Sequence, residues 1–321
     1  MKILITGATG FVGRAIAEKL KSKHHVAGLA RSTSSAKKLE ERGIVPVIGN
    51  LLDVQTAQFF GYDVVIHCAA FVEEWGTEKD FFETNVTGTE RVILAAKAGG
   101  VKRFIFIGTE AAFFDGQDLL NIDESIQYPK HLPYHYSRSK AEAERKVLAA
   151  TTSEFKTLSL RPRFVWGPGD QSVLPALIAM IKRNRFAWID HGKYQISSTY
   201  IDNLVHAVEQ ALPYGEGGEA FFIADEGTVQ LREFLTAALQ TQGIKAPSKS
   251  IPKPLARGIA RAVELIWNTL NIKSNPPLTR FSTDMMSAYC TVNTEKAKKI
   301  LKYSPPVSRE QGLERLAQSK I

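Results

Sequence analysis

The sequence predicts an α/β fold in which a doubly wound parallel sheet is followed by a smaller, mostly helical C-terminal domain. Three observations lead to this prediction. Short apolar runs alternate with segments whose apolar residues recur at helical spacing through residues 1–168. A turn with glycines at three-residue intervals follows the first apolar run. A cluster of Pro and Gly at 161–170 then interrupts the alternation and indicates a change of domain.

The composition is that of an ordinary globular protein, with 44% hydrophobic and 23% charged residues. A chain of 321 residues is long enough for one doubly wound domain and a smaller one. The formal net charge of +8 suggests anionic ligands. Because Lys and Arg are scattered and no aromatic ladder accompanies them, nucleic acid is not expected as a partner. Phosphate on a cofactor, or an acidic membrane surface, is sufficient to account for the charge.

The sequence predicts a cytoplasmic protein without a metal site. The first strand begins directly at the N-terminus, which leaves no room for a signal peptide. No run approaches the ~18 uninterrupted apolar residues of a membrane-spanning helix. Cys68 and Cys290 lack metal-binding spacing and are expected to be free thiols in a reducing compartment.

The first fifteen residues contain the segment around which the chain is organised. Lys2–Thr6 is long enough for a buried strand, and Phe11–Leu20 has helical apolar spacing. Glycines between them permit a tight turn, close approach of phosphates, and close packing of helix on strand. This arrangement predicts a dinucleotide site rather than a merely structural turn. The residues predicted to bind the cofactor here are Gly7, Thr9, Gly10, Phe11, Val12 and Gly13.

The second predicted strand, His25–Ala30, ends in Arg31 and Ser32. A carboxylate at this position would accept a hydrogen bond from the ribose 2′-hydroxyl and select NAD. Arg and Ser instead suit a 2′-phosphate, so NADP is the predicted cofactor and NAD is the alternative. The competing interpretation is an Arg on a solvated loop.

Two further strands follow, the second at Tyr62–His67. Asp53, which lies between them, is expected to accept from the adenine amino group, to cap a helix at Val54–Phe60, or both. His67 lies within the strand register and is expected to be packed rather than catalytic. The small residue Ala69 allows the backbone to approach the cofactor.

Polar residues beyond the fourth strand are candidates for chemistry. Asn85 lies within a predicted helix over Lys79–Gly99, where Asn is mildly disfavoured, so we expect it to have a polar role. Thr109 follows a strand at Lys102–Ile107, and the carboxyl ends of parallel strands are where such folds place their chemistry. The loop 111–132 is long enough to be a functional lid.

Tyr136 and Lys140 lie four residues apart in a predicted helix over 133–147, and therefore on one face of it. A lysine ammonium near a phenol favours the phenolate and lowers the pKa of the phenol. Tyr136 is therefore a candidate acid or base at neutral pH. The competing interpretation is a surface helix with one aromatic residue. Tyr134 has no lysine four residues on and is expected to pack.

Residues 253–270 form a predicted amphipathic helix in the C-terminal domain. Most such apolar stripes pack into a core, but a basic amphipathic helix can also contact lipid or cover an apolar ligand. The sequence leaves these three roles open: core, peripheral membrane contact and lid. The stripe consists of Leu255, Ile259, Val263, Ile266 and Leu270, and Arg257 and Arg261 lie beside it.

Together these motifs resemble the extended short-chain dehydrogenase/reductase family over essentially the whole chain. The resemblance implies a dinucleotide-binding Rossmann domain over 1–168, with later returns near 193–224, and a substrate domain over 169–321. The chain is most similar to the 3β-hydroxysteroid dehydrogenase and sterol dehydrogenase branch. The motifs that carry the resemblance are Thr6–Gly13, Tyr136-x-x-x-Lys140, Leu160–Asp170, Ser198–His206 and Gly218–Ala224.

The resemblance also implies roles for single residues. Tyr136 would be the general acid/base, Lys140 would bind the nicotinamide ribose and lower the pKa of Tyr136, and Thr109 would hydrogen-bond the substrate oxygen. Asn85 would support the site. The family position of Thr109 is more often Ser. The residues implied beside the nicotinamide carboxamide are Pro162, Phe164 and Val165.

Three functions fit these motifs. The first is hydride transfer between NADP and a secondary alcohol or ketone of a bulky apolar substrate, such as a 3β-hydroxysteroid or a long-chain keto acid. The second is a nucleotide-sugar epimerase or dehydratase on the same scaffold. The third is a non-enzymatic dinucleotide sensor, against which the presence of Tyr136 and Lys140 argues. Family members often pair through the helices at 79–99 and 133–150, which makes a homodimer a candidate and leaves the oligomeric state open.

The side chains near the predicted site favour the first function over the second. Aromatic residues follow strands four and five, where an apolar pocket is expected. A sugar diphosphate would instead require a basic cleft. The aromatic residues are Phe71, Trp75, Phe113, Phe114 and Trp166, and the candidate diphosphate ligands are Arg163, Lys182, Arg183 and Arg185.

Overall fold

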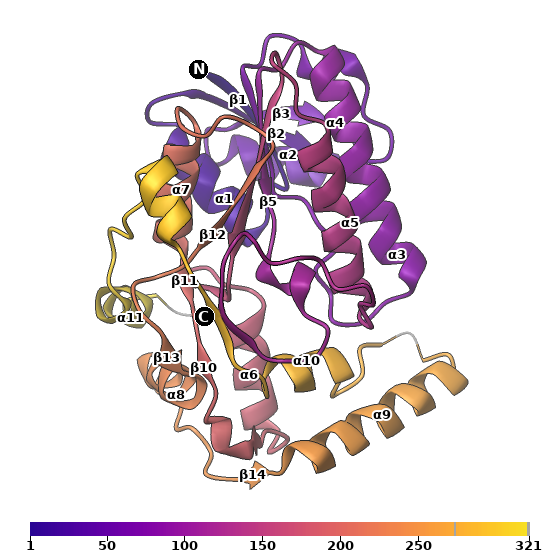
Figure 1. Ribbon diagram of the computed structural model, residues 1–321, viewed down its shortest axis with the longest axis vertical. Helices are drawn as coiled ribbons and strands as arrows, with labels where there is room; N and C mark the ends of the chain where they lie inside the picture. The colour runs from indigo at the N-terminus through magenta and orange to yellow at the C-terminus, as the bar shows by residue number, and fades with distance from the viewer. Residues whose placement is uncertain (273, 320–321) are drawn as a thin grey trace.

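Seven parallel strands form the central sheet of the part of the chain that the computed structural model describes, residues 1–272 and 274–319 (Figure 1). Their order is β12-β7-β5-β4-β1-β2-β3, so the winding reverses beside β1. This is the doubly wound arrangement, and the predicted fold class is confirmed. The strands are β1 (Lys2–Thr6), β2 (His25–Ala30), β3 (Val45–Ile48), β4 (Val64–His67), β5 (Arg103–Ile107), β7 (Lys156–Pro162) and β12 (Glu219–Ile223).

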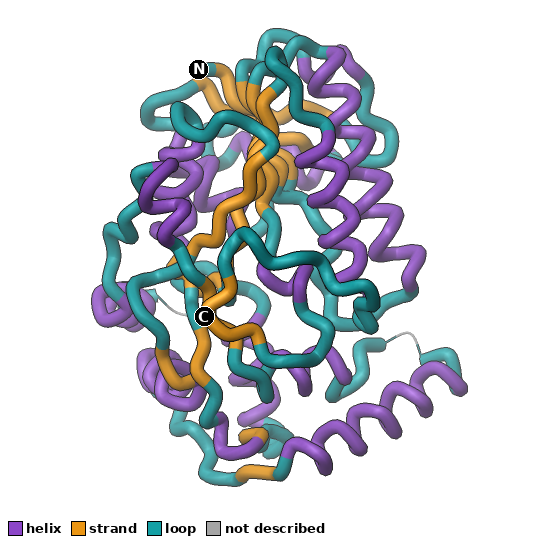
Figure 2. Tube along the Cα trace, in the orientation of Figure 1, coloured by secondary structure: helices purple, strands orange, loops and turns teal. Residues whose placement is uncertain are grey.

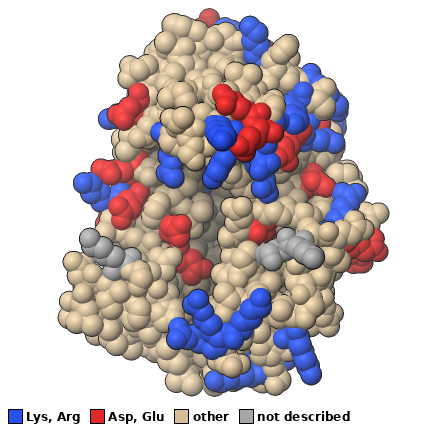
Figure 3. Space-filling view, turned by 180° about the vertical axis from the view of Figure 1, so that it is seen from behind, with Lys and Arg blue, Asp and Glu red and all other residues tan. Residues whose placement is uncertain are grey.

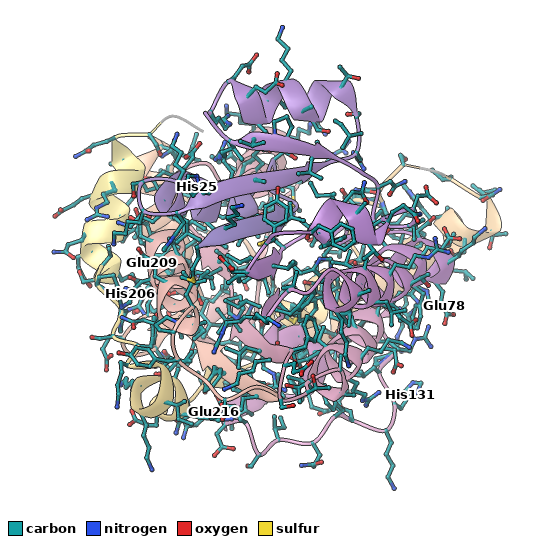
Figure 4. The ribbon with its side chains drawn as sticks, turned by 90° about the horizontal axis from the view of Figure 1, so that it is seen from above. His25, Glu78, His131, His206, Glu209 and Glu216 are labelled. Carbon is teal, nitrogen blue, oxygen red and sulfur yellow. The ribbon has the colours of Figure 1, made fainter. Side chains whose placement is uncertain are left out.

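The two faces of the sheet carry different helices because successive strand residues point to opposite sides. Ile3 and Ile5 of β1 share a core with α1, α2 and α7, whereas Leu4 shares the other core with α4 and α5. The view from above shows Glu78 of α3 and His206 of α7 on opposite sides of the sheet (Figure 4). The helices are α1 (Phe11–Leu20), α2 (Thr33–Glu40), α3 (Glu78–Phe82), α4 (Thr89–Ala98), α5 (His135–Ala149) and α7 (Ile201–Ala211).

Short strands and further helices form the smaller C-terminal region (Figure 2). Trp188 and Tyr200 are fully buried in its core, and Trp166 packs edge-on against Tyr200 with ring centroids 4.9 Å apart. Its strands are β6 (Leu119–Ile122), β8 (Val165–Trp166), β9 (Trp188–Ile189), β10 (Gln195–Ile196), β11 (Thr199–Tyr200), β13 (Val229–Gln230), β14 (Ser250–Ile251) and β15 (Cys290–Val292). Its helices are α6 (Val173–Lys182), α8 (Leu231–Thr241), α9 (Lys253–Thr269), α10 (Arg280–Met285) and α11 (Arg309–Ala317).

Two connections differ from the sequence prediction. The helix predicted over 79–99 is interrupted by a π-helical turn at Glu83–Gly88. The expected lid over 111–132 contains β6, which pairs with β15 of the C-terminal region. The strand pairing ties this connection down along part of its length.

The expectation that Asp53 caps a helix at Val54–Phe60 is wrong. The segment forms a 3₁₀ turn at Thr56–Phe59, and Gln55 occupies its N-cap position. The Gln55 backbone N–H donates to the Gln58 side chain at 2.7 Å, so the turn is closed by glutamines. The Asp53 carboxylate instead lies on the surface.

The apolar stripe of α9 is not core. Leu255 is 52% exposed, Ile266 is 48% exposed and Leu270 is 66% exposed. Residues 1–272 and 274–319 contain no helix that is long and apolar enough to cross a membrane. The stripe is therefore a surface feature.

The turn between β1 and α1 has almost no free space. Gly7 has a φ of +68°, which disfavours any other residue there. A Cβ atom at Gly13 would lie 2.3 Å from the Gly7 carbonyl oxygen, far inside van der Waals contact. Glycine at position 13 therefore lets α1 pack directly on the turn.

We predict that Gly13→Ala destabilises the protein by roughly 1–3 kcal/mol, because the backbone carbonyl cannot move away without shifting β1 or α1. The matched control is Gly258→Ala in α9, where an added Cβ meets no other described atom within 4 Å. That substitution should stabilise by about 0.5–1 kcal/mol through helix propensity. Equilibrium urea unfolding measures both, and equal effects would contradict the packing argument.

Candidate active site

Three strand ends meet at the carboxyl edge of the sheet, where β1, β4 and β5 are neighbours. The Gly7 turn presses on the segment after β4, since a Cβ at Gly7 would lie 2.7 Å from the Ala69 nitrogen. Helix α1 starts after Gly10, and among the described residues no side chain caps its first turn. The N–H groups and positive end of the helix therefore suit an anionic group such as a pyrophosphate.

The surroundings of this turn fit a dinucleotide. Thr9 and Gly10 are exposed, while Phe11 and Val12 are partly exposed. Phe11 and Val12 pack on the core of the C-terminal region, which fixes the start of α1. The chain thus presents backbone rather than bulky side chains to a phosphate at this point.

Arg31 and Ser32 lie on the surface at the end of β2. The Ser32 hydroxyl caps α2 by accepting from the Ser35 backbone N–H at 3.2 Å. The Ser32 hydroxyl therefore already has a hydrogen-bond partner within α2, whereas the Arg31 side chain is exposed to solvent. Asp53 is also exposed, with its carboxylate 3.9 Å from the Arg91 guanidinium.

His67 is packed, as expected. It is completely buried, and its ring nitrogens lie 2.7 Å from the Thr6 hydroxyl and 2.9 Å from the Thr89 hydroxyl. Burial and the nearby Lys140 ammonium lower the pKa of His67 to about 3. The ring is therefore neutral and serves as a hydrogen-bonded core group.

Asn85 connects three segments around the site. It is buried in the π-helical turn, where its side-chain oxygen accepts from the Phe71 N–H at 2.7 Å. Its amide donates to the Phe71 carbonyl and to the Ser139 hydroxyl, each at 3.0 Å. Asn85 thereby joins the segment after β4 to α5. Asn85 lies in the π-helical turn at Glu83–Gly88, and such turns are frequent at functional sites.

Lys140 is buried against β5. Its ammonium donates to the Ile107 carbonyl at 2.9 Å and lies 4.1 Å from the centre of the Phe106 ring. Burial lowers the pKa of Lys140 to about 8, and the Glu144 carboxylate opposes this shift. A partly desolvated ammonium at a strand end is well suited to hold a hydroxyl-rich ligand such as a ribose.

Glu144 is the centre of a buried network that the sequence prediction missed. It accepts from the Arg161 guanidinium at 2.9 Å and, through short hydrogen bonds, from the hydroxyls of Ser159 and Tyr128. The only available signal was its position four residues beyond Lys140, on the same helix face. The network fastens α5 to β7.

The structure brings Tyr136 and Thr109 together. The Thr109 side chain hydrogen-bonds Tyr136, and its own hydroxyl proton is directed to the Glu110 carboxylate at 2.9 Å. The two side chains expected to flank the reacting oxygen are thus neighbours at the end of β5.

The expected lowering of the Tyr136 pKa by Lys140 is wrong for the protein as it stands. Burial and the Glu110 carboxylate raise the pKa of Tyr136, and the hydrogen bond with Thr109 only partly offsets them. The Lys140 ammonium donates to the Ile107 carbonyl and is not among the groups that shift the pKa of Tyr136. The phenol therefore keeps its proton at neutral pH.

Glu110 is a second buried group that the sequence prediction missed. It is 2% exposed and lies 3.2 Å from the equally buried Arg163 guanidinium. Burial raises the pKa of Glu110, and Arg163 counteracts the shift. This pair places a carboxylate that is paired with an arginine next to Thr109.

The segment after β7 lies beside this pair. β7, which ends at Pro162, is the neighbour of β5, so Pro162 and Val165 lie along the same edge of the sheet as Thr109. Phe164 has a φ of +48°, an uncommon conformation for a bulky residue. Its ring packs edge-on against Phe234, with centroids 5.6 Å apart. The backbone turn there is held by packing.

Aromatic rings surround Tyr136, although not all the expected ones. The Phe281 ring of α10 lies 5.7 Å from that of Tyr136, and the Phe81 ring lies 6.5 Å from it. Phe113 and Phe114 do not line an open pocket, because both are fully packed in the core. Phe281, more than a hundred residues away in sequence, was not predicted.

Comparison with known proteins agrees with this geometry. A model of the NAD dependent epimerase/dehydratase family matches residues 3–224. A 4-hydroxy-2-methyl-3-oxo-4-farnesyl-3,4-dihydroquinoline-1-oxide ketoreductase of Stigmatella aurantiaca is 37% identical, covering 99% of this chain and 96% of the relative. A 2-alkyl-3-oxoalkanoate reductase of Stenotrophomonas maltophilia is 33% identical, with 99% of each chain covered.

Two further comparisons confirm the resemblance to the sterol dehydrogenase branch and the fold. A decarboxylating sterol-4-alpha-carboxylate 3-dehydrogenase of Dictyostelium discoideum is 31% identical, covering 98% of this chain and 99% of the relative. The structure of a UDP-glucuronic acid 4-epimerase from Bacillus cereus in complex with NAD superposes with a TM-score of 0.75. It is 20% identical over 99% of each chain, and this similarity shows the fold.

We predict that Glu110→Gln lowers the pKa of Tyr136, because it removes the negative charge that raises it. In the alcohol-oxidising direction, which needs a deprotonated base, the acid limb of the kcat/KM profile should move to lower pH. Loss of one partner of the buried pair should also cost about 3–5 kcal/mol of stability.

The control is Glu264→Gln, which removes another buried carboxylate that pairs with an arginine but is not among the charges that shift the pKa of Tyr136. It should lower stability and leave the pH profile unchanged. An unmoved profile in Glu110→Gln would show that the Glu110 charge does not act on the phenol.

Proposed function

The chain belongs to the NAD dependent epimerase/dehydratase family, and on that premise we propose that it reduces the ketone of a bulky apolar substrate with NADPH. The observation that carries the proposal is the contact between Thr109 and a protonated Tyr136 that has the Phe281 ring beside it. A phenol that keeps its proton is an acid, and ketone reduction requires an acid at the carbonyl oxygen.

The residues divide the chemistry between them. When bound, the nicotinamide supplies the hydride. Tyr136 gives its proton to the oxygen of the ketone as negative charge develops there. Thr109 holds the Tyr136 oxygen in place, and Lys140 binds the nicotinamide ribose from its position at the end of β5. Asn85 keeps the segment after β4 in register with α5, which fixes the floor of the site.

The apolar substrate class is supported by the side chains around Tyr136. The partly buried Phe281 places a ring rather than a charge beside Tyr136, and the buried Phe81 packs against Tyr136 as well. Arg163, a candidate diphosphate ligand, is buried and already neutralised by Glu110. The relatives' names also describe ketones with farnesyl or alkyl chains. A sugar diphosphate would need unpaired cations beside Tyr136, and Arg163, the described candidate nearest to the site, is already paired with Glu110.

The test is NADPH oxidation with two substrate panels: 2-alkyl-3-oxoalkanoates and ring ketones, against UDP- and dTDP-sugars with isomerisation monitored. We expect turnover in the ketone panel, rising with chain length because each buried CH₂ contributes about 0.8 kcal/mol. Tyr136→Phe should lower kcat by about 10² or more with cofactor affinity nearly intact. Isomerisation in the sugar panel alone would favour an epimerase, and cofactor binding with no turnover in either would favour a sensor.

We further propose that NADPH is preferred over NADH because Arg31 stands where NAD-selective folds place a carboxylate. A charged hydrogen bond to the 2′-phosphate should contribute about 1.5–3 kcal/mol, roughly ten- to a hundredfold in Kd. Titration of both cofactors into wild type and Arg31→Ala measures it. Lys37→Ala, in the last turn of α2, is the control for a change in net charge. Equal affinities in the wild type would contradict the proposal.

A further inference from the structure

Helix α9 turns its apolar stripe outward. Along the stripe, Leu255 is 52% exposed, Ile259 is 42%, Ile266 is 48% and Leu270 is 66%. Their spacing of four, seven and four residues places them on one side of an α-helix. A surface helix of a globular protein normally has the opposite arrangement, with its apolar side packed against the core.

The inner side of α9 is small and charged instead. Ala256 and Ala260 are completely buried, and Glu264 is 8% exposed. Glu264 pairs with Arg280 of α10 at 2.5 Å, and Arg257 pairs with Asp284 of the same helix. Helix α9 is therefore attached to α10 through its polar side. Because this attachment sets the orientation of the helix, the apolar stripe is held on the outside.

Exposed cations lie beside the start of α9 and at one position on the helix itself. Between Gln242 and Val263 the sequence has five Lys or Arg and no Asp or Glu. Lys245, Lys249 and Arg261 are exposed. The end of α6 adds the exposed Lys182, Arg183 and Arg185, and it is brought close because Trp188 of β9 donates to the Lys249 carbonyl at 2.9 Å.

The figures show the same surface. Lys and Arg side chains gather at the lower centre of the face in Figure 3, where Figure 1, seen from the other side, places α6, β14 and the start of α9. In Figure 1, α9 forms the lower border of the molecule. A row of apolar side chains flanked by exposed cations matches the interface of an anionic lipid bilayer, which is apolar inside and negatively charged at its surface.

The surface is close to the candidate active site. Helix α10 separates α9 from Tyr136, and its Phe281 ring lies 5.7 Å from that of Tyr136. The same helix is paired with α9 through Arg280 and Asp284. A molecule docked on lipid through α9 therefore has its reactive phenol one helix away from the bilayer.

We propose that α9 and the adjoining basic segments bind the surface of an anionic lipid bilayer. The apolar stripe enters the boundary between headgroups and acyl chains, and Lys182, Arg183, Lys245, Lys249 and Arg261 face lipid phosphates. The interaction is peripheral, since α9 carries charges on its inner side. It does not depend on the proposed reaction, and it gives an apolar ketone dissolved in lipid a short route to the site.

The test is co-sedimentation of the full chain with vesicles of phosphatidylcholine alone or mixed with phosphatidylglycerol, at low and high salt. We expect binding to the anionic vesicles that weakens at high salt. Replacing Lys245, Lys249 and Arg261 by Gln should weaken it about fivefold for each cation. Leu255→Gln with Ile266→Gln should weaken it by about tenfold for each side chain.

The matched control is Leu94→Gln with Leu120→Gln, which changes two leucines of α4 and β6 that are 62% and 63% exposed. It should bind vesicles like the wild type. Unchanged binding in the Leu255/Ile266 variant, or absent binding in the wild type, would overturn the proposal. So would a wild-type dimer in light scattering that only the Leu255/Ile266 variant converts to monomer, since the stripe would then join two copies. Turnover of soluble substrates is unaffected by any of these outcomes.

Discussion

One row of side chains on α5 holds the site together. Tyr136, Lys140 and Glu144 follow at intervals of four residues and therefore lie along one side of the helix. Glu144 binds Arg161 of β7, Lys140 binds the Ile107 carbonyl of β5, and Tyr136 meets Thr109 at the end of β5. A helix fastened at three successive turns cannot slide or rotate against the sheet. The position of the phenol thus depends on the two contacts above it.

Most of these groups are charged and buried, and this constrains the region. Arg161 and Glu144 are at most 4% exposed, as are Lys140 and Glu110. Removing such charges from water is expensive, and pairing them returns little net stability. Breaking one pair leaves the partner uncompensated, which costs much more. The main effect of these pairs is therefore to specify one arrangement of α5 on the sheet, and their contribution to the free energy of unfolding is small. The same low dielectric lets Glu110 act on Tyr136, because nearby charges are poorly screened.

The sequence predicted what depends on local spacing and missed what depends on distant partners. Short-range patterns predicted the glycine turn, the doubly wound fold class and the Tyr136–Lys140 pair. They did not predict the protonation of Tyr136, since it depends on the burial of the phenol and on Glu110, whose own burial no local pattern reveals. The sequence predicted that α9 is amphipathic, but it did not predict which side of the helix faces the protein. Ion pairs with α10 hold the polar side inward. Phe281 reached Tyr136 only through the tertiary fold.

Asp284 joins the site to the outer surface. Its carboxylate accepts from the Tyr134 hydroxyl at 2.6 Å, just before α5, and it also pairs with Arg257 of α9. The Tyr134 ring meanwhile stacks on the buried Phe114 and packs against Phe281. Tyr134 was expected only to pack, yet its hydroxyl connects the start of α5 to α10. Because one carboxylate serves both partners, α9 cannot move away from α10 without leaving a partly buried charge unpaired. The helix that carries the exposed apolar stripe and the helix that carries the reactive phenol are therefore held in one frame.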